Sequence, residues 1–216
     1  MTKKCVIVLS GGLDSTTVAY WAKSQKYKLH ALTFKYGQIA NREINCAIEI
    51  ATQLCASIKI IDFSSLKEIY SGVTSLVDEK IPLTKKFSHP IVVPFRNAIF
   101  LSTAVAYAQS IDAKHIFYGA QGSDANNYPD CRKEFYKAFE KAAQLGTESN
   151  ILIEAPFSNV TKAELLLKGV ELKVPFNKTW SCYREGDFHC GECESCLNRK
   201  KAFKEAKIED PTKYEK

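Results

Sequence analysis

The 216-residue chain is long enough for one globular domain with a small appendage, and its 45% share of hydrophobic residues argues against disorder. Its net charge of +6 suits anionic ligands but is too diffuse to require a nucleic acid as partner. No apolar run approaches the length of a membrane span, and the short run after Lys3 and Lys4 has no signal-peptide cleavage context. We therefore expect a cytoplasmic protein that contacts neither a membrane nor a nucleic acid.

The N-terminal segment predicts a phosphate-binding loop. Residues 5–9 form an apolar run typical of a buried parallel strand, and a helical pattern follows Ser10, Gly11 and Gly12 at once. The first turn of such a helix offers free N–H groups and the positive end of the helix dipole. Glycines also let the backbone approach an oxygen-rich ligand closely. The alternative is an ordinary glycine-rich turn in which Asp14 only faces the helix dipole.

Further strands and helices alternate along the chain. We expect strands over residues 28–34, 58–63, 115–118 and 151–154, and helices over 41–56, 96–110 and 132–145. Gly146 is the expected C-cap of the last of these helices, and a capping box at Thr161 begins a short helix that Gly169 ends. Residues 64–95 predict a long connection of the kind that often forms a lid, and residues 123–131 predict a polar loop. This order predicts a doubly wound α/β fold with a mainly parallel sheet and a ligand site at the carboxyl ends of its strands.

Four of the eight cysteines lie close together near the C-terminus, at Cys182, Cys190, Cys193 and Cys196. Four thiolates at this spacing can close a tetrahedral zinc shell with bonds of about 2.3 Å, which leaves no position for water. We therefore predict a structural Zn²⁺, with an iron–sulfur cluster as the alternative. Residues 179–216 would then form a zinc-binding module packed on a main domain of residues 1–178.

The other cysteines fall into two groups. Cys5, Cys46 and Cys55 occupy apolar positions and are expected to be small core residues. Cys131 lies in the polar loop, where it is either a nucleophile or sulfur carrier, or a packed side chain.

Several motifs in this chain resemble one enzyme family. The stretch Ser10-Gly11-Gly12-Leu13-Asp14-Ser15 resembles the pyrophosphate loop of the N-type ATP pyrophosphatases, which split ATP between its α- and β-phosphates. With the motifs that follow it, the chain closely resembles the 7-cyano-7-deazaguanine synthase family over residues 5–203. Those motifs are Tyr36-Gly37-Gln38, Val93-Pro94-Phe95-Arg96-Asn97, Tyr128-Pro129-Asp130-Cys131-Arg132, Lys162-Ala163-Glu164, Thr179-Trp180-Ser181-Cys182-Tyr183 and the cysteine-rich tail to Arg199. Ala40 stands where the family usually has His, and Asn126-Asn127 where it usually has Ser-Gly.

The resemblance implies an adenine nucleotide alpha hydrolase-like fold and the activity of a carbon–nitrogen ligase. Such an enzyme uses ATP, Mg²⁺ and ammonia to convert 7-carboxy-7-deazaguanine to 7-cyano-7-deazaguanine, a queuosine precursor, through adenylated intermediates. A homodimer is implied as well. A tRNA-modifying adenylase and a non-catalytic zinc-ribbon module that binds nucleic acid are the alternative interpretations.

The resemblance also suggests the residues of the nucleotide site. ATP would be held by Leu9, Ser10, Gly11, Gly12, Leu13, Asp14, Ser15, Thr16, Thr17, Thr33 and Phe34. Ser10 would hold the departing pyrophosphate, Asp14 would meet Mg²⁺, and Lys162 and Arg96 would contact phosphates, so these four residues carry the catalytic roles. A solvated Lys162 and a salt-bridged Arg96 are the alternatives, and Asn97 either binds the ribose or caps a helix.

The deazaguanine would bind the loop that follows the fourth strand. Its amino and ring N–H groups need an acidic acceptor, its flat face an aromatic platform, and its carboxylate a cation. The loop offers Asp124, Tyr128, Asp130 and Arg132. We expect Asp130 to accept from the base edge, Tyr128 to stack, and Arg132 to pair with the carboxylate. The alternative is that Asp130 and Arg132 cap the following helix.

Overall fold

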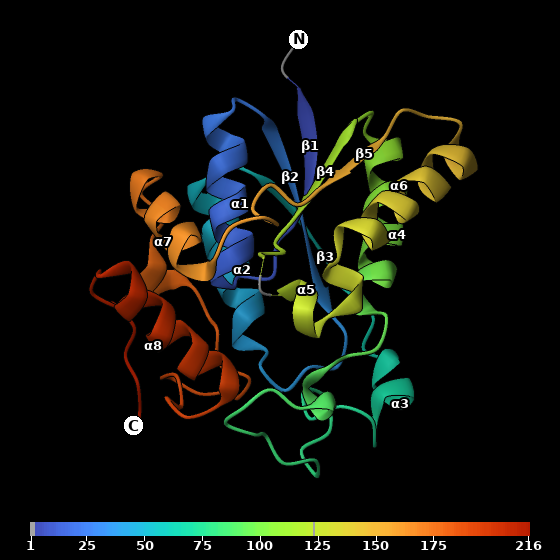
Figure 1. Cartoon of the computed structure of the whole chain (residues 1–216). Coiled ribbons are helices and arrows are strands. Elements are labelled where there is room, and N and C mark those ends of the chain that lie inside the picture. The colour runs from blue at the N-terminus through green and yellow to red at the C-terminus, as the bar shows by residue number, and fades with distance from the viewer. Residues whose placement is uncertain (1–2, 123) are drawn as a thin grey trace.

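A parallel sheet of five strands lies at the centre of the computed structural model, which describes residues 3–122 and 124–216 (Figure 1). The predicted main domain also includes Met1, Thr2 and Ser123, which lie outside the described residues. The strand order is β3-β2-β1-β4-β5 and every neighbouring pair is parallel, which confirms the doubly wound fold. In such a sheet the ligand-binding crevice lies where the strand order reverses, here between β1 and β4. The strands are β1 (Lys4–Val8), β2 (Lys28–Lys35), β3 (Ser57–Asp62), β4 (His115–Tyr118) and β5 (Leu152–Glu154).

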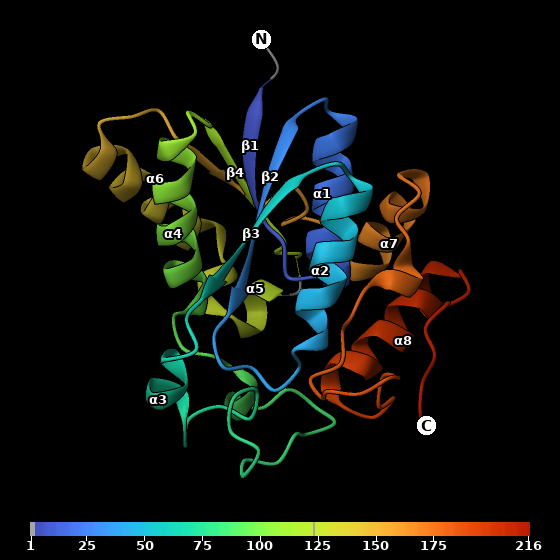
Figure 2. The ribbon, with the colours of Figure 1, turned by 180° about the vertical axis from the view of Figure 1, so that it is seen from behind.

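Helices cover both faces of the sheet (Figures 1 and 2). One layer holds α1 (Leu13–Ser24), α2 (Arg42–Gln53), α7 (Lys162–Glu171) and α8 (Glu194–Ala206), and the other holds α4 (Arg96–Ser110) and α6 (Lys133–Thr147). Successive residues of β1 face opposite layers, because Cys5 and Ile7 belong to the core that α1 and α2 share whereas Val6 belongs to the core of α4. Helix α8 adds Ala202 and Phe203 to the first core, so the cysteine-rich tail shares that core with α1 and α2.

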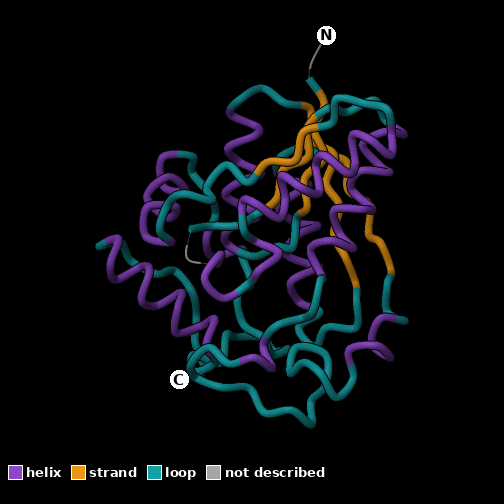
Figure 3. The backbone as a smooth tube through the Cα atoms, turned by 45° about the vertical axis from the view of Figure 1, so that its right-hand side comes forward, coloured by secondary structure: helices purple, strands orange, loops and turns teal. Residues whose placement is uncertain are grey.

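The connections at the carboxyl ends of the strands gather at one end of the molecule (Figures 1 and 3). Residues 64–95, expected to be irregular, contain the short helix α3 (Leu66–Tyr70). The expected polar loop over residues 123–131 contains α5 (Asp124–Asn127) and a 3₁₀ turn at Pro129–Cys131. Hydrophobic periodicity does not reveal helices of about one turn, and for this reason the sequence predicted none of the three.

Two glycines that were expected to end helices lie inside them. Helix α6 continues through Gly146 and ends where Glu148 adopts a left-handed conformation with φ 49°. Helix α7 continues through Gly169, which serves close packing: a Cβ at Gly169 would lie 2.5 Å from Cζ of Phe176. Both C-cap predictions are therefore wrong.

The three cysteines expected in the core differ in exposure. Cys5 is buried and Cys46 is half-buried, whereas Cys55 is exposed. The prediction for Cys55 is wrong because the residue follows the end of α2 in a left-handed conformation, with φ 51°, where the chain turns toward β3.

Among the described residues, one stretch is apolar enough to cross a membrane by length and composition alone. It lies within His89–Ser110, where an 18-residue window has a mean hydropathy of 1.4. This stretch includes α4, which packs against the sheet and buries Ala98, Leu101, Ala104 and Ala108. Its place in the core accounts for its apolar composition.

Candidate active site

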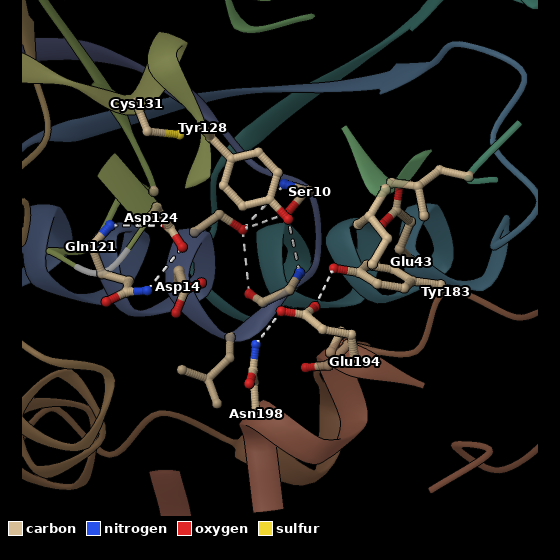
Figure 4. Close-up of a pocket in the computed structure, with 18 of the residues that line it drawn as sticks. Ser10, Asp14, Glu43, Gln121, Asp124, Tyr128, Cys131, Tyr183, Glu194 and Asn198 are labelled. Atoms are coloured by element: carbon tan, nitrogen blue, oxygen red, sulfur yellow. Dashed lines mark hydrogen bonds between the residues drawn. The ribbon is translucent and has the colours of Figure 1, made fainter. Parts of the chain in front are cut away.

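A cavity of about 770 Å³ opens at the carboxyl ends of the strands, where β1 and β4 diverge (Figure 4). Its walls come from segments that are far apart in the sequence. One wall is the glycine-rich loop and the start of α1, and another is the connection before α4. Further lining residues come from the end of β2 and the start of α2, the α5 region, the first residue of α7, and the cysteine-rich tail.

The glycine-rich loop is held by hydrogen bonds among its own residues. Oγ of Ser10 lies 3.0 Å from Oγ of Ser15, and the Gly12 N–H donates to Ser10 Oγ over 3.3 Å. Gly12 is the N-cap of α1 and Gly11 adopts φ 82°, so the loop turns sharply into the helix. A Cβ at Gly11 would lie 2.1 Å from the carbonyl oxygen of Glu43, which makes a side chain there impossible without rearrangement.

The predicted ATP-binding residues divide into two groups. The cavity is lined by Leu9, Ser10, Gly12, Leu13, Asp14, Ser15 and Phe34. The others, Gly11, Thr16, Thr17 and Thr33, are buried and are not part of the cavity lining. Thr17 shows why, since its hydroxyl donates to the carbonyl of Leu13 over 2.9 Å and thus serves the helix itself. These four residues lie behind the residues that line the cavity.

An ion pair joins the loop to α7. Nζ of Lys162, directly after the N-cap Thr161, lies 3.1 Å from Oδ2 of Asp14. Thr161 forms the predicted capping box, with the Glu164 N–H donating to its hydroxyl over 3.2 Å. Burial alone would lower the pKa of Lys162, but Asp14 and Asp124 together raise it, so the ammonium stays charged. Oδ1 of Asp14 is buried and has no hydrogen-bond partner among the described residues, which leaves an acceptor for a cation.

Asp124 lies beside this pair and is held by Gln121. Nε2 of Gln121 donates to Oδ1 of Asp124 over 2.8 Å, and the Gln121 backbone N–H donates to Oδ2 over 3.2 Å (Figure 4). Burial and the nearby Asp14 carboxylate raise the pKa of Asp124 to about 6, against the opposing effect of Lys162. The loop, α5 and α7 thus place two carboxylates and one cation at the same side of the cavity.

Arg96 lines the cavity at the first position of α4. Its guanidinium donates to the hydroxyl of Tyr36 over 2.9 Å and lies 5.5 Å from the centre of that ring. Burial opposes the charge of Arg96, yet Tyr36, Asp130 and Glu43 raise its pKa. The cation is therefore kept charged inside the cavity wall, and its hydrogen bond goes to a tyrosine.

The predicted substrate loop is only partly directed into the cavity. Asp124, Tyr128 and Asp130 line it, but Arg132 does not. Arg132 is exposed and its Nε donates to the carbonyl of Ala125 over 3.0 Å. The expected pairing of Arg132 with a substrate carboxylate does not fit this position, because the guanidinium lies outside the lining.

Asp130 supports α4 and does not cap the helix that follows it. Its Oδ2 accepts from the backbone N–H of Asn97 over 3.0 Å, at the second residue of α4. Nδ2 of Asn97 in turn donates to Sγ of Cys131 over 3.3 Å. Burial raises the pKa of the Cys131 thiol, with Asp124 and Asp130 adding to the shift, so the thiol stays protonated at neutral pH. Cys131 lines the cavity, and its contact with Asn97 and its raised pKa favour the packed side chain over the nucleophile.

Sequence reasoning missed a set of polar groups opposite the loop. The hydroxyl of Tyr183 donates to Oε2 of Glu194 over 2.9 Å, and Nδ2 of Asn198 donates to Oε1 of the same carboxylate (Figure 4). Tyr128 faces the ring of Phe87 edge-on at 5.7 Å, and burial raises the pKa of Tyr128 to about 12. Tyr128 and Tyr183 stand in motifs named above, but Phe87, Glu194 and Asn198 do not, and the contacts of Phe87 and Glu194 with the two tyrosines form only in the fold.

The four predicted zinc ligands lie together. Their Sγ atoms all lie within 4.8 Å of one another, with Cys182 and Cys193 separated by 4.0 Å and Cys190 and Cys196 by 3.9 Å. Bonds of about 2.3 Å to one tetrahedral Zn²⁺ place sulfur atoms about 3.8 Å apart, so the donor set fits this ion. Backbone N–H groups also donate to the sulfur atoms, as Cys193 does to Cys190 over 3.3 Å, which suits thiolate ligands.

The cysteine-rich tail is hydrogen-bonded to the glycine-rich loop. The Trp180 N–H donates to the carbonyl of Gly11 over 2.9 Å. Arg199 is fully buried and donates to Oγ1 of Thr179 over 2.8 Å, to Oγ of Ser181 over 3.1 Å and to the carbonyl of Phe176 over 2.9 Å. The backbone that carries Trp180 is thereby tied to α8.

Comparisons with known proteins identify the family of this chain. The profile of the family "Queuosine biosynthesis protein QueC" matches residues 4–207. The chain belongs to this family. The 7-cyano-7-deazaguanine synthase of Thermoplasma acidophilum is 45% identical and covers 99% of this chain and 93% of that protein. The synthase of the same name from Clostridium kluyveri is 44% identical, with 98% of each chain covered.

Solved structures show the same fold as this QueC-family chain at lower sequence similarity. NMN synthetase from Francisella tularensis aligns with a TM-score of 0.54 and 20% identity over 82% of this chain and 64% of that one. The U34-tRNA thiolase NcsA from Methanococcus maripaludis, with its [4Fe-4S] cluster, aligns with a TM-score of 0.52 and 18% identity over 95% and 68%. Both the predicted family and the adenine nucleotide alpha hydrolase-like fold are thus confirmed.

Proposed function

We propose that this protein converts 7-carboxy-7-deazaguanine and ammonia to 7-cyano-7-deazaguanine with ATP, as a carbon–nitrogen ligase of queuosine precursor biosynthesis. The observation that carries the proposal is the single cavity in which the glycine-rich loop, the Asp14–Lys162 pair and the Tyr128 loop meet in a QueC-family chain. A nucleotide phosphate and a flat base can therefore lie side by side. Adenylation needs this alignment and charge compensation more than covalent help from the protein.

The glycine-rich loop, Lys162 and Asp14 support the nucleotide half of the reaction. Ser10, Gly12 and Ser15 would donate to the departing pyrophosphate at the N-terminus of α1. Lys162 would compensate the charge that develops on it. The unpartnered Oδ1 of Asp14 would hold Mg²⁺, which supplies further charge compensation when bound.

The Tyr128 loop supports the base half. Tyr128 would stack on the deazaguanine, while Asp124 and Asp130 offer acceptors to its amino and ring N–H groups. Arg96 lines the cavity where Arg132 does not, so we assign it to the substrate carboxylate and to the α-phosphate. These two groups become joined in the adenylate, and one guanidinium can therefore serve both.

We extend the proposal to the metal and the assembly. Cys182, Cys190, Cys193 and Cys196 would hold a structural Zn²⁺ that orders a module of residues 179–216 on the main domain of residues 1–178. We further propose a cytoplasmic homodimer that acts on small molecules and needs no nucleic acid or membrane.

Product analysis tests the function. The protein is incubated with ATP, Mg²⁺, ammonium and 7-carboxy-7-deazaguanine, and the nucleotides and the base are identified by mass spectrometry. We expect AMP, pyrophosphate and the nitrile, all dependent on the carboxylated base. Formation of ADP and phosphate in stoichiometric amounts would contradict the proposal.

A further inference from the structure

Glu43 is a carboxylate of the cavity wall that the proposed reaction has not yet used. It lies in the first turn of α2 and lines the cavity (Figure 4). Nε2 of Gln38 donates to its Oε1 over 2.9 Å. Gln38 is itself fixed at both ends, since Nε2 also donates to the carbonyl of Phe34 over 2.9 Å and Oε1 accepts from the Tyr36 N–H over 2.7 Å. The fold therefore holds this carboxylate in one orientation.

The position of Glu43 is next to the reacting groups of the proposed adenylate. Its backbone carbonyl contacts Gly11 of the phosphate loop so closely that a Cβ there would lie 2.1 Å away. Arg96 is near enough to affect its titration. Between the loop and Arg96 lies the place that we assign to the α-phosphate and the acyl group. Ala40, three residues before Glu43, also lines the cavity, and its methyl side chain cannot accept a proton.

The environment suits a carboxylate that exchanges a proton at neutral pH. Burial raises the pKa of Glu43 to about 7, against the lowering effects of the Gln38 hydrogen bond and of Arg96. Glu185, from the cysteine-rich tail, raises it further, and the Arg96-bound Tyr36 and the thiol of Cys46 are titratable groups nearby. A general base works best with a pKa close to the working pH.

The other carboxylates that line this cavity have different partners or positions. Asp14 pairs with Lys162, Asp124 and Asp130 are assigned to the edge of the base, Glu194 accepts from Tyr183 and Asn198, and Glu205 is exposed. Among the described residues that line the cavity there is no histidine. Glu43 is thus the carboxylate that remains available on the side of α2.

We propose that Glu43 is the general base that takes a proton from ammonium and releases ammonia to attack the acyl adenylate. This inference rests on the proposed function. The carboxylate accepts one proton from ammonium, and the nitrogen lone pair then forms the C–N bond to the acyl carbon. The C–O bond to AMP breaks, AMP leaves with that electron pair, and the new amide nitrogen loses one further proton to water.

The test compares two nucleophiles in the parent protein and in Glu43→Gln. Ammonia is almost entirely protonated at neutral pH and needs a base, whereas hydroxylamine is largely unprotonated and traps acyl adenylates as hydroxamates without one. We expect Glu43→Gln to lose about a hundredfold or more in the rate with ammonium. Its rate of hydroxamate formation should stay close to that of the parent. Glu49→Gln, an exposed position on the same helix, is the matched control and should change neither rate.

The pH profile gives a second reading. In the parent, the rate with ammonium should fall as the pH drops below about 7, because protonation removes the base. Glu43→Asp should retain this break in the profile at a lower rate, whereas the residual rate of Glu43→Gln should follow only the fraction of free ammonia, with no break near pH 7. Equal losses with both nucleophiles, or a full rate of Glu43→Gln with ammonium, would overturn the role of Glu43 while leaving the proposed function intact. A parent protein that forms no hydroxamate and no AMP would overturn both.

Discussion

Two opposite parts of the cavity lining are built in different ways. The part formed by the glycine-rich loop and the start of α1, here called the phosphate wall, comes from one continuous strand–loop–helix unit. Ser10, Gly12 and Ser15 form hydrogen bonds with one another within six residues of sequence. The part that we assign to the base, here called the base wall, brings together Tyr128, Phe87 and Tyr183 from three distant segments. The first can form from local preferences, whereas the second exists only once the whole chain has folded.

The cysteine-rich tail is the link between the walls. Trp180 donates its N–H to Gly11 of the phosphate loop, and the Glu194 N–H donates to the carbonyl of Thr84 in the connection before α4 over 3.1 Å. Both donors lie within two residues of a predicted zinc ligand. A metal held by these cysteines would therefore stabilise the backbone that contacts each wall.

The largest effect is expected from removing the metal site. Cys196→Ser should abolish zinc binding and lower thermal stability strongly, since the free energy of zinc binding in small modules is about 10 kcal/mol or more. ATP affinity should fall with it, because Trp180 loses its fixed position under Gly11. Metal analysis, thermal unfolding and calorimetric ATP binding measure the three quantities. Cys55→Ser changes an exposed thiol and is the matched control. A zinc-free, stable Cys196→Ser protein with full ATP affinity would show that the two regions are independent.

The next effect concerns the phosphate wall alone. Lys162→Ala removes the cation between Asp14 and Asp124 and should lower turnover by about a hundredfold or more, while the base still binds. Steady-state AMP release measures turnover and calorimetry measures binding of the base. Lys168→Ala, on the exposed side of the same helix, should change neither. Turnover within twofold of the parent would exclude Lys162 from the charge compensation that we assign to it.

Sequence alone predicted the local features well. The strand–loop–helix unit, the zinc ligands and the capping box at Thr161 each depend on residues that are close in the sequence, so spacing was enough. Helix α4 and strand β4 also matched their expected bounds.

The features that sequence reasoning missed depend on distant contacts. Glu43 looks like an ordinary surface residue of an amphipathic helix until Gln38 and Gly11 pack around it. Arg132 was assigned by charge type, but the 3₁₀ turn before it directs its guanidinium to the carbonyl of Ala125. The residue types in a loop can indicate its chemistry. The direction of each side chain, however, depends on short turns that hydrophobic periodicity does not reveal.

A smaller effect is expected from adding a side chain to the glycine-rich loop, where Gly11 packs closely against α2. Gly11→Ala places a Cβ against Glu43 at a φ of 82°, and strain of this kind costs about 1–3 kcal/mol before any clash is counted. Urea unfolding should show this loss, and ATP affinity should fall. Gly146→Ala, inside α6 with open space around it, should be neutral or stabilising. Equal stabilities of the two variants would mean that the loop can move away from α2.

The smallest effects should distinguish Asp130 from Arg132 in the loop that carries Tyr128. Asp130→Ala removes the acceptor for the Asn97 N–H and should cost about 1 kcal/mol of stability, as the loss of a helix cap does. It should also weaken binding of the carboxylated base, because the start of α4 carries Arg96. Arg132→Ala should leave stability and base binding unchanged, since the guanidinium is exposed and outside the cavity lining. Urea unfolding and calorimetric titration with the base compare the two variants, with ATP binding as the common reference. If Arg132→Ala loses base affinity while Asp130→Ala keeps it, Arg132 turns into the cavity when substrate binds, and the assignment of the carboxylate to Arg96 is wrong.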